Sequence, residues 1–337
     1  MPNSDPTTDR LDSSYGGLKV TVTGGLGFIG SNLARRLVEI GAHVQIVDSL
    51  QPHTCGNLSN ISDLQGRLRV HQLDLRDCGT TTQIFAGQDV IFNLAGQVSH
   101  IDSMTDPVSD LGANVHAQIV LLESCRHHAP EARIVFASTR QIYGRPLHTP
   151  VSEDHPLRPV DVNGINKMAA EAYHSLYHQV YGLQTVSLRL TNTYGPRMRV
   201  KDARQTFLGI WIRRAIEDSS FEVWGGQQQR DLTYVDDVVD AFLLAACCTA
   251  AQGQIFNIGG GPPVSLLALA ETLVAVAGVG RFENKEFPPE RLRIDIGDYF
   301  ADDRRFRELT GWKPKVSLQE GLARTVSYYQ SRFSDYV

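Results

Sequence analysis

The sequence has few cysteines, no long apolar run and no cluster of basic residues, and each absence disfavours a class of protein. Five cysteines without C-x-x-C spacing disfavour a zinc or disulfide framework and indicate reduced thiols. The best apolar run, residues 241–248, is far too short to span a membrane. Basic and acidic residues are interspersed in a chain of net charge −5, so neither a nucleic-acid nor a membrane partner is expected.

The N-terminal segment, residues 1–17, lacks the basic start and the apolar core of a signal peptide. It is polar, and we expect a disordered tail over this range. Without a targeting or membrane segment, the composition predicts a cytoplasmic protein. The length of 337 residues exceeds a typical single domain and predicts one large core with an additional lobe.

Glycine is concentrated at one informative place. Residues 18–23 form a short β-branched run that predicts a buried strand, and residues 28–40 have the apolar period of a helix. Between them, Gly24 permits a tight turn, Gly27 lets the backbone approach a pyrophosphate, and Gly30 lets the helix pack on the strand. Free N–H groups at the helix N-terminus favour phosphate. The pattern predicts a dinucleotide site.

A carboxylate refines this prediction. A second strand, residues 44–47, ends in Asp48, 18 residues after Gly30. At this spacing a carboxylate accepts hydrogen bonds from the adenine ribose hydroxyls. Because the same charge would repel a 2′-phosphate, the sequence favours NAD over NADP as cofactor.

Strand-like and helix-like segments alternate through the first half of the chain. The expected strands are residues 68–73, 90–94, 134–137 and 185–190, and the expected helices are residues 80–85, 108–126 and 165–181. This alternation predicts an α/β fold with a doubly wound parallel sheet, whose ligands bind beyond the carboxyl ends of the strands. We expect an NAD-binding domain over residues 18–190, with return segments at about 230–258, and a smaller, interleaved substrate lobe over residues 191–337.

Several motifs follow one another in the order found in one enzyme family. They are TGGLGFIG at 23–30, VDSL at 47–50, LDLRD at 73–77, NLAGQVS at 93–99, ASTRQIYG at 137–144, Lys167, LTNTYGPR at 190–197, QRDLTYVDDV at 229–238 and GWKPKVSLQEGL at 311–322. Through them, residues 18–328 resemble the extended short-chain dehydrogenase/reductase family. Within it the chain is similar to the UDP-sugar 4-epimerases, and among these to the UDP-glucuronate 4-epimerases of antibiotic-sugar pathways.

The resemblance implies a set of NAD-binding and catalytic positions. The implied cofactor-binding residues are Gly24, Gly27, Phe28, Ile29, Gly30, Asp48, Asp74, Leu75, Leu94, Ala95 and Lys167. In the family, a tyrosine takes the proton of the sugar C4 hydroxyl while hydride leaves for NAD⁺, assisted by a serine or threonine and by a lysine four residues after the tyrosine. In this chain Thr139 and Lys167 match the hydroxyl and the lysine, but the tyrosine position is Asn163.

An asparagine has no titratable group and cannot act as the base, so three accounts compete. Thr139 could relay the proton toward Lys167, directly or through water. Tyr143, or another nearby side chain, could replace the missing phenol. Alternatively, the protein binds NAD and a sugar nucleotide without turnover. The relay is the favoured account, and the retained Thr139, Lys167 and substrate motif disfavour binding without turnover.

The type of reaction follows from side chains that are missing. The family's 4,6-dehydratases carry an acidic pair in the loop where this chain has Arg140 and Gln141. Without these acids, the resemblance implies oxidation at C4, rotation of the 4-keto sugar and return of the hydride to the other face. NAD would then be regenerated in each cycle and stay bound as a cofactor.

The resemblance also implies a substrate site. Asn192 and Arg230 match diphosphate-contacting residues, Val223 lies where the family seats uracil, and Arg291 or Arg293 would close the diphosphate site. Arg199 matches an arginine that faces the sugar carboxylate, and Ser138 and Thr139 could add hydroxyl donors. UDP-glucuronate is therefore the leading substrate, followed by UDP-glucose or an N-acetylated UDP-hexose. The family's helix pairing implies a homodimer, and no metal site is expected.

Overall fold

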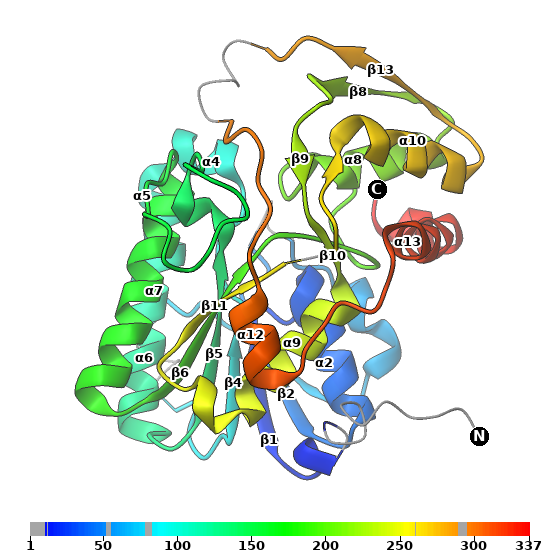
Figure 1. The fold of residues 1–337 in the computed structure, drawn as a ribbon. Helices are drawn as coiled ribbons and strands as arrows, with labels where there is room; N and C mark the ends of the chain where they lie inside the picture. The colour runs from blue at the N-terminus through cyan, green and yellow to red at the C-terminus, as the bar shows by residue number, and fades with distance from the viewer. Residues whose placement is uncertain (1–10, 12, 52–54, 78–82, 260, 289–294) are drawn as a thin grey trace.

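A seven-stranded parallel sheet forms the centre of the protein (Figure 1). The computed structural model describes residues 11, 13–51, 55–77, 83–259, 261–288 and 295–337. In spatial order, the strands are β11 (Ile255–Ile258), β6 (Gln184–Leu190), β5 (Arg133–Thr139), β4 (Val90–Asn93), β1 (Lys19–Thr23), β2 (His43–Asp48) and β3 (Arg69–Gln72). Strand order reverses around β1, where Val22 pairs with Ile46 on one side and with Phe92 on the other. Ligands of such sheets bind at this reversal.

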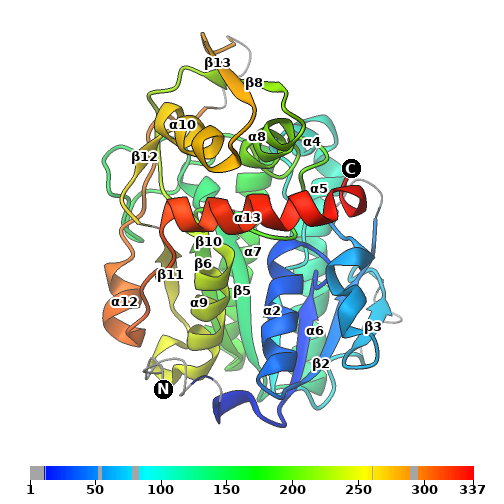
Figure 2. The same ribbon diagram turned by 90° about the vertical axis from the view of Figure 1, so that its right-hand side faces the viewer.

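Helices cover both faces of the sheet (Figures 1 and 2). α2 (Phe28–Glu39) and α9 (Val235–Cys247) lie on one face, and α6 (Ala117–His128) and α7 (Val162–Tyr181) lie on the other. α7 begins after Asp161, whose Oδ1 accepts a hydrogen bond from the N–H of Gly164 at 2.7 Å, and it ends at a left-handed Gly182. The predicted α/β fold with a doubly wound sheet is confirmed.

A smaller lobe lies beyond the sheet, at the top of Figure 1. Its apolar core is shared by α8 (Phe207–Ile216), the parallel pair β8 (Ser220–Trp224) and β13 (Arg281–Lys285), and α10 (Leu266–Ala277). α13 (Leu318–Arg332) crosses between this lobe and the sheet and packs on α8 and α10 (Figure 2). Between the segments of the lobe, the chain returns to the sheet through α9 and β11.

The remaining elements are short. They are η1 (Leu58–Leu64), α4 (His100–Thr105), η3 (Arg140–Tyr143), β7 (Asn192–Tyr194), β9 (Gln229–Arg230), β10 (Leu232–Tyr234), η4 (Thr249–Ala251), β12 (Val264–Ser265), α12 (Arg304–Thr310) and η5 (Phe333–Asp335). Among the described residues, no helix combines the length and the apolar character that crossing a membrane requires.

The expected disordered tail is wrong for residues 11 and 13–17, the part of it that the structure describes. Leu11 and Tyr15 are fully buried in the core between the sheet and α9. The Tyr15 hydroxyl donates a hydrogen bond to the carbonyl oxygen of Leu243 at 2.8 Å, and its ring lies 6.4 Å from that of Phe92. Two large side chains in a polar segment therefore anchor it, and local composition did not reveal this burial.

Two predicted helices differ from expectation. Residues 83–87 form a turn and residues 78–82 lie outside the described residues, so the helix predicted at 80–85 is wrong where it is described. The helix predicted at 108–126 consists of α5 (Pro107–Leu111), a π-helical segment (Gly112–His116) and α6. π-helical turns are frequent at functional sites. Here the segment includes the fully buried Asn114, whose side chain lies against Gly96 at the pocket.

Candidate active site

One pocket of about 650 Å³ runs along the carboxyl edge of the sheet, from the glycine turn to the lobe. All the predicted cofactor-binding residues line it. They are Gly24, Gly27, Phe28, Ile29, Gly30, Asp48, Asp74, Leu75, Leu94, Ala95 and Lys167. The pocket wall also contains Thr139, Asn163, Ser138, Asn192 and Arg230 from the predicted catalytic and substrate sets. Residues far apart in the sequence thus meet at one edge of the sheet.

The glycine turn is packed so closely on neighbouring backbone that Gly24 and Gly30 cannot carry side chains. Gly24 has φ +66°, and a Cβ there would lie 2.9 Å from the carbonyl carbon of Leu94. A Cβ on Gly30 would lie 2.9 Å from the Cα of Gly25 and closer still to the carbonyl oxygen of Gly24. Gly27, the N-cap of α2, has no side chain to cap the helix, so the first N–H groups are left for an anion.

Asp48 is held at the end of β2 by backbone donors. Its Oδ2 accepts from the N–H of Leu26 and its Oδ1 from the N–H of Leu50, both at 3.0 Å. Burial raises the pKa of this carboxyl, while the two backbone hydrogen bonds oppose the rise. The carboxylate is therefore oriented before any ribose binds.

Asn163 belongs to a buried amide network. Its side chain is 2% exposed, and Nδ2 donates to the carbonyl oxygen of Gln97 at 2.8 Å and to Asp110 Oδ2 at 3.2 Å. The other Asp110 oxygen accepts from Asn114 at 3.0 Å and from Asn166 at 2.8 Å. The residue in the tyrosine position thus links α7 to Asp110 of α5 and to Gln97 in the loop after β4.

Lys167 lies one turn further along α7, at the inner end of the pocket. Its Nζ donates to the carbonyl oxygen of Ala137 at 3.2 Å and lies 5.0 Å from the centre of the Phe136 ring. Burial lowers the pKa of this amine to about 8, although the charge of Asp110 opposes the shift. An amine with this pKa exchanges protons near neutral pH.

The two hydroxyls before the η3 turn differ in availability. Thr139 Oγ1 accepts a hydrogen bond from the N–H of Gln141 at 3.3 Å, which leaves its own proton free for a substrate oxygen. Ser138 Oγ instead donates to Glu171 Oε2 at 2.7 Å, and Glu171 is paired with the buried Arg189. Ser138 borders the pocket, but its hydroxyl already donates its hydrogen bond to Glu171.

Tyr143 is not a substitute for the missing phenol. It is fully buried, and the described wall of the pocket does not include it. Its hydroxyl donates to Asn257 Oδ1 at 2.7 Å and accepts from Arg189 at 2.6 Å. Burial raises the pKa of Tyr143 to about 12 despite the neighbouring Arg189 charge. These contacts join Tyr143 to β11 and β6, so the geometry favours a structural role for this side chain.

A histidine that the sequence reasoning missed faces the reaction end of the pocket. His100, the first residue of α4, lines the pocket together with Thr139, Gln141 and Asn163. Its Nδ1 lies 2.5 Å from Asp161 Oδ2, and its Nε2 contacts the side-chain amide nitrogen of Gln141. The available signal was its position directly after the NLAGQVS motif.

The substrate end of the pocket contains buried donors without acceptors. Arg140 donates to Asn192 Oδ1 at 3.2 Å. Among the described residues, Arg140 Nη1, Asn192 Nδ2 and Thr193 Oγ1 are buried without a hydrogen-bond partner. Burial, followed by the charge of Arg140, lowers the pKa of Arg230 to about 10. Converging donors and two buried guanidinium groups fit an anionic group such as a diphosphate.

Two other predicted substrate residues do not contribute as expected. Val223 has its side chain in the core of the lobe, and its neighbour Trp224 lines the pocket. Arg199 is absent from the described pocket wall, because its guanidinium pairs with Asp202 at 2.6 Å. Arg204, which the sequence reasoning left unassigned, lines the pocket instead. Arg291 and Arg293 lie outside the described residues.

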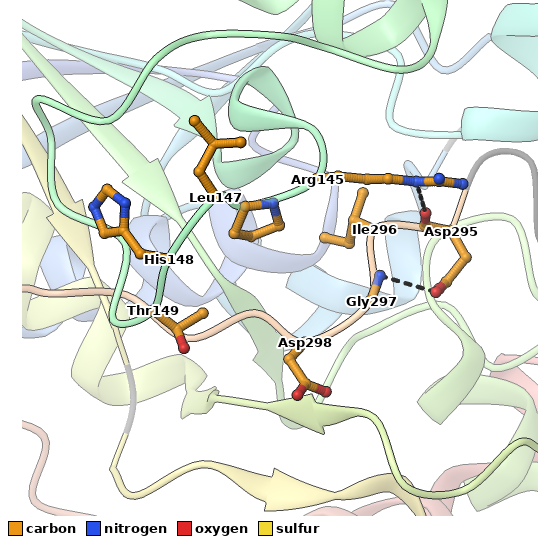
Figure 3. A pocket seen from close by; sticks show the side chains of 9 residues that line it. Arg145, Leu147, His148, Thr149, Asp295, Ile296, Gly297 and Asp298 are labelled. Carbon is orange, nitrogen blue, oxygen red and sulfur yellow. Dashed lines mark hydrogen bonds between the residues drawn. The ribbon is translucent and has the colours of Figure 1, made fainter.

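A second pocket, of about 610 Å³, is lined by residues 145–149 and 295–298 (Figure 3). Arg145 Nε donates to the carbonyl oxygen of Asp295 at 2.9 Å, and the N–H of Gly297 donates to Asp295 Oδ2 at 2.9 Å. None of the predicted catalytic or cofactor residues that the structure describes lines it. We therefore assign the active site to the first pocket.

Known proteins share both the sequence pattern and this architecture. The profile of the NAD dependent epimerase/dehydratase family matches residues 20–259. The UDP-glucose 4-epimerase of Mycolicibacterium smegmatis is 33% identical over 318 residues, which cover 94% of this chain and 99% of that protein. The chain belongs to the NAD dependent epimerase/dehydratase family.

Solved structures agree with this family membership. The crystal structure of UDP-glucose 4-epimerase from Thermotoga maritima with UDP-glucose has a TM-score of 0.86 and 31% identity, covering 94% of this chain and all of that one. The Thermus thermophilus UDP-glucose 4-epimerase, in complex with NAD, has a TM-score of 0.81 and 30% identity, covering 93% and 99% of the two chains.

The family's cofactor fits the residues present. NAD supplies a two-electron hydride acceptor when bound. The uncapped start of α2 and the glycine turn would hold its pyrophosphate, Asp48 the adenosine ribose, and Lys167 the nicotinamide ribose. Among the described residues, no three His, Cys, Asp or Glu side chains gather as a metal site would require.

Proposed function

We propose that this protein is an NAD-dependent 4-epimerase of a UDP-sugar, with UDP-glucuronate as its preferred substrate and UDP-galacturonate as its product. The unpartnered donors of Arg140, Asn192 and Thr193 carry the proposal, because they call for an anionic group at the substrate end of the pocket. Lys167 and Thr139 lie in the same pocket, where oxidation at C4 would occur. A sugar nucleotide can bridge these two ends.

Each residue then has a defined task in the reaction. Arg140, Asn192 and Arg230 bind the diphosphate, and Thr139 orients the C4 hydroxyl. Lys167 binds the nicotinamide ribose and, with its lowered pKa, can exchange a proton with the site. Arg140 and Gln141 replace the acids that dehydration would need, so the 4-keto sugar rotates and is reduced on its other face.

Arg204 supports a uronic acid as substrate. Its guanidinium lines the pocket and is held only loosely, 3.6 Å from Asp102. A 6-carboxylate needs a cation to offset its desolvation, and Arg204 is available where Arg199 is not. The second candidate is UDP-glucose, which the names of the related 4-epimerases favour.

The test is incubation of purified protein with UDP-glucuronate, UDP-glucose and UDP-N-acetylglucosamine, followed by chromatography of the products. We expect UDP-galacturonate to form fastest. Arg204→Gln should lower kcat/KM for UDP-glucuronate about 10–100-fold, as expected for loss of a charged hydrogen bond, and leave UDP-glucose turnover unchanged. Arg199→Gln is the matched control. Turnover of UDP-glucose without turnover of UDP-glucuronate would overturn the substrate assignment.

We further propose a homodimer formed through α5 and α7. Apolar side chains that are about half exposed or more lie on these helices. They are Val108, Leu111, Ile165, Leu176 and Val180. Ile165, Leu176 and Val180 recur on α7 at intervals of 11 and 4 residues, which places them on one face of the helix. Such a contiguous apolar face favours association of two copies.

A further inference from the structure

His100 is fixed through both ring nitrogens to residues that flank the catalytic positions. Asp161, bound at Nδ1, precedes Asn163 by two residues, and Gln141, bound at Nε2, follows Thr139 by two residues. The histidine ring therefore lies between the loop of Thr139 and the start of α7. Both residues border the pocket, where the His100 side chain is 35% exposed and that of Asp161 is 4% exposed.

The partners of the ring determine its tautomer. A carboxylate oxygen accepts, so the hydrogen of neutral His100 is on Nδ1, which donates to Asp161. An amide nitrogen only donates, so Nε2 presents its lone pair to Gln141. Burial raises the pKa of Asp161, but the hydrogen bonds from His100 and from the N–H of Gly164, together with the charge of Arg140, keep the pKa below its ordinary value. Asp161 thus stays ionised and keeps the ring in this tautomer.

We propose that His100, positioned by Asp161, takes the place of the family's tyrosine as the proton acceptor for the C4 hydroxyl. This proposal rests on the proposed 4-epimerase function. It gives Asn163 a structural task and makes the relay from Thr139 to Lys167 unnecessary for the first proton transfer. In it, the substrate hydroxyl replaces the Gln141 amide as the partner of Nε2.

The step balances with bound NAD⁺ as the oxidant. Nε2 of His100 accepts the hydroxyl proton while the C4–O double bond forms, and the electron pair of the C4–H bond leaves as hydride to NAD⁺. After the 4-keto sugar rotates, the hydride returns to the opposite face of C4. The imidazolium then gives the proton back to the new alkoxide, which restores neutral His100 and NAD⁺.

Several charged groups surround the dyad. Asp161, at the start of α7, contacts Nδ1 of His100. Arg140 on η3 acts on Asp161, Asp102 lies on the same helix as His100, and Arg204 pairs with Asp102 from the facing loop. Lys167 lines the same pocket from α7. These charges have opposite signs, so a titration of His100 itself is the direct measurement.

The first experiment is NMR of the NAD-loaded enzyme with ¹⁵N-labelled histidine, and His100→Gln assigns the signal. We expect neutral His100 to carry its hydrogen on Nδ1 and to have a bare Nε2. Asp161→Asn is the informative variant, because its side-chain oxygen can still cap Gly164 while its NH₂ faces Nδ1 and moves the ring hydrogen to Nε2. A hydrogen on Nε2 in the wild-type enzyme would overturn the proposal.

The second experiment compares rates, using UDP binding as evidence of an intact fold. His100→Gln should lower kcat about 10²–10⁴-fold and abolish the acidic limb of the kcat–pH profile. Asp161→Asn should lower kcat while leaving UDP affinity within twofold. The matched control for His100→Gln is His127→Gln, at an exposed histidine, which should leave kcat unchanged.

If the wild type epimerises no UDP-sugar, the proposed function fails and this proposal with it. If the wild type is active and His100→Gln keeps its rate, only the histidine proposal fails, and loss of activity in Thr139→Val would then assign the proton to the relay.

Discussion

Asn163 cannot act as the base that the family's tyrosine provides, but its side chain makes buried hydrogen bonds that stabilise the site. Its amide joins Gln97 to Asp110 in a buried network, where an unpaired group is costly. The other members of the network, Asn114 and Asn166, contact the same carboxylate. The network ties the wall of the cofactor site to α7, the helix that carries Lys167.

Asn163→Ala should therefore destabilise the fold more than it impairs catalysis. Removing a donor to a buried carboxylate and a buried carbonyl should lower the free energy of unfolding by about 1–3 kcal/mol. With His100 as the base, kcat should fall by less than about tenfold, the change that corresponds to about 1.4 kcal/mol. Urea unfolding and initial rates check both values, and a large loss of kcat with unchanged stability would contradict this account of Asn163.

His174 should make the fold sensitive to acid. It is fully buried, its ring stacks 4.2 Å from that of Phe136, and burial lowers its pKa to about 4. The folded state thus binds this proton less readily than the unfolded state, whose histidine has a pKa of about 6.5. Neutral, buried His174 therefore contributes about 3 kcal/mol to the free energy of unfolding. The contribution is complete above pH ~6.5 and is lost as the pH falls toward ~4.

The measurement is urea unfolding between pH 7 and pH 4. Relative to wild type, His174→Gln should flatten the stability curve in this window, whereas the exposed His127→Gln should leave its slope unchanged. Equal slopes in wild type and His174→Gln would mean that another group governs the acid response.

At the scale of single residues, the site residues that could be predicted from the sequence are those marked by a local pattern. The glycine spacing and Asp48 are local signals, and all these residues line one pocket. The pairing of His100 with Asp161 joins residues 61 positions apart, and no local pattern encodes it. Likewise, Arg199 and Arg204 share one basic segment, and only the fold shows that Asp202 binds the first and leaves the second at the pocket.

Among the elements, the turn between β1 and α2 is the most restrictive, because backbone atoms surround its glycines. At Gly30, an added methyl group would meet the backbone of Gly24 and Gly25, which cannot move aside as a side chain can. We expect Gly30→Ala to lower NAD affinity at least about tenfold, since the N–H groups at the start of α2 would shift.

Calorimetric titration of NAD into cofactor-stripped protein measures this change. Gly261→Ala is the control, since an added Cβ at Gly261 would meet nothing within 4 Å. Unchanged NAD affinity in Gly30→Ala would contradict the assignment of the turn to the cofactor.

The existence of the elements was more predictable than their interruptions. Apolar period and glycine boundaries predicted the strands and the long helices. Asn114, in the π-helical segment Gly112–His116, donates to the carbonyl oxygen of Gln97 after β4, a contact that no local pattern reveals. The buried Leu11 and Tyr15 were missed for the same reason, because their partners in α9 come more than 200 residues later.

At the scale of the whole molecule, the lobe and the sheet must both contact one substrate. The pocket wall includes Trp224 and Phe287 from the lobe as well as Thr139 and Asn192 from the ends of the sheet strands. A UDP-sugar that spans these parts would bind to both and stabilise their arrangement.

The proposed dimer makes a separate prediction. Val180→Asp places a charge on the apolar face of α7, where the side chain is 60% exposed, and should shift the protein from dimer to monomer in light scattering after gel filtration. The control is Leu147→Asp, which is 62% exposed, belongs to neither α5 nor α7, and should stay dimeric. A monomeric wild type at micromolar concentration would refute the dimer.

The most direct test of the central claim follows the hydrogen at C4 of the sugar. UDP-glucuronate carrying deuterium at C4 is incubated with NAD-loaded protein, and the product is analysed by mass spectrometry and NMR. Our account predicts UDP-galacturonate that keeps the deuterium at C4, without accumulation of NADH. Epimer that has exchanged the label for solvent hydrogen, or no epimer at all, would contradict it.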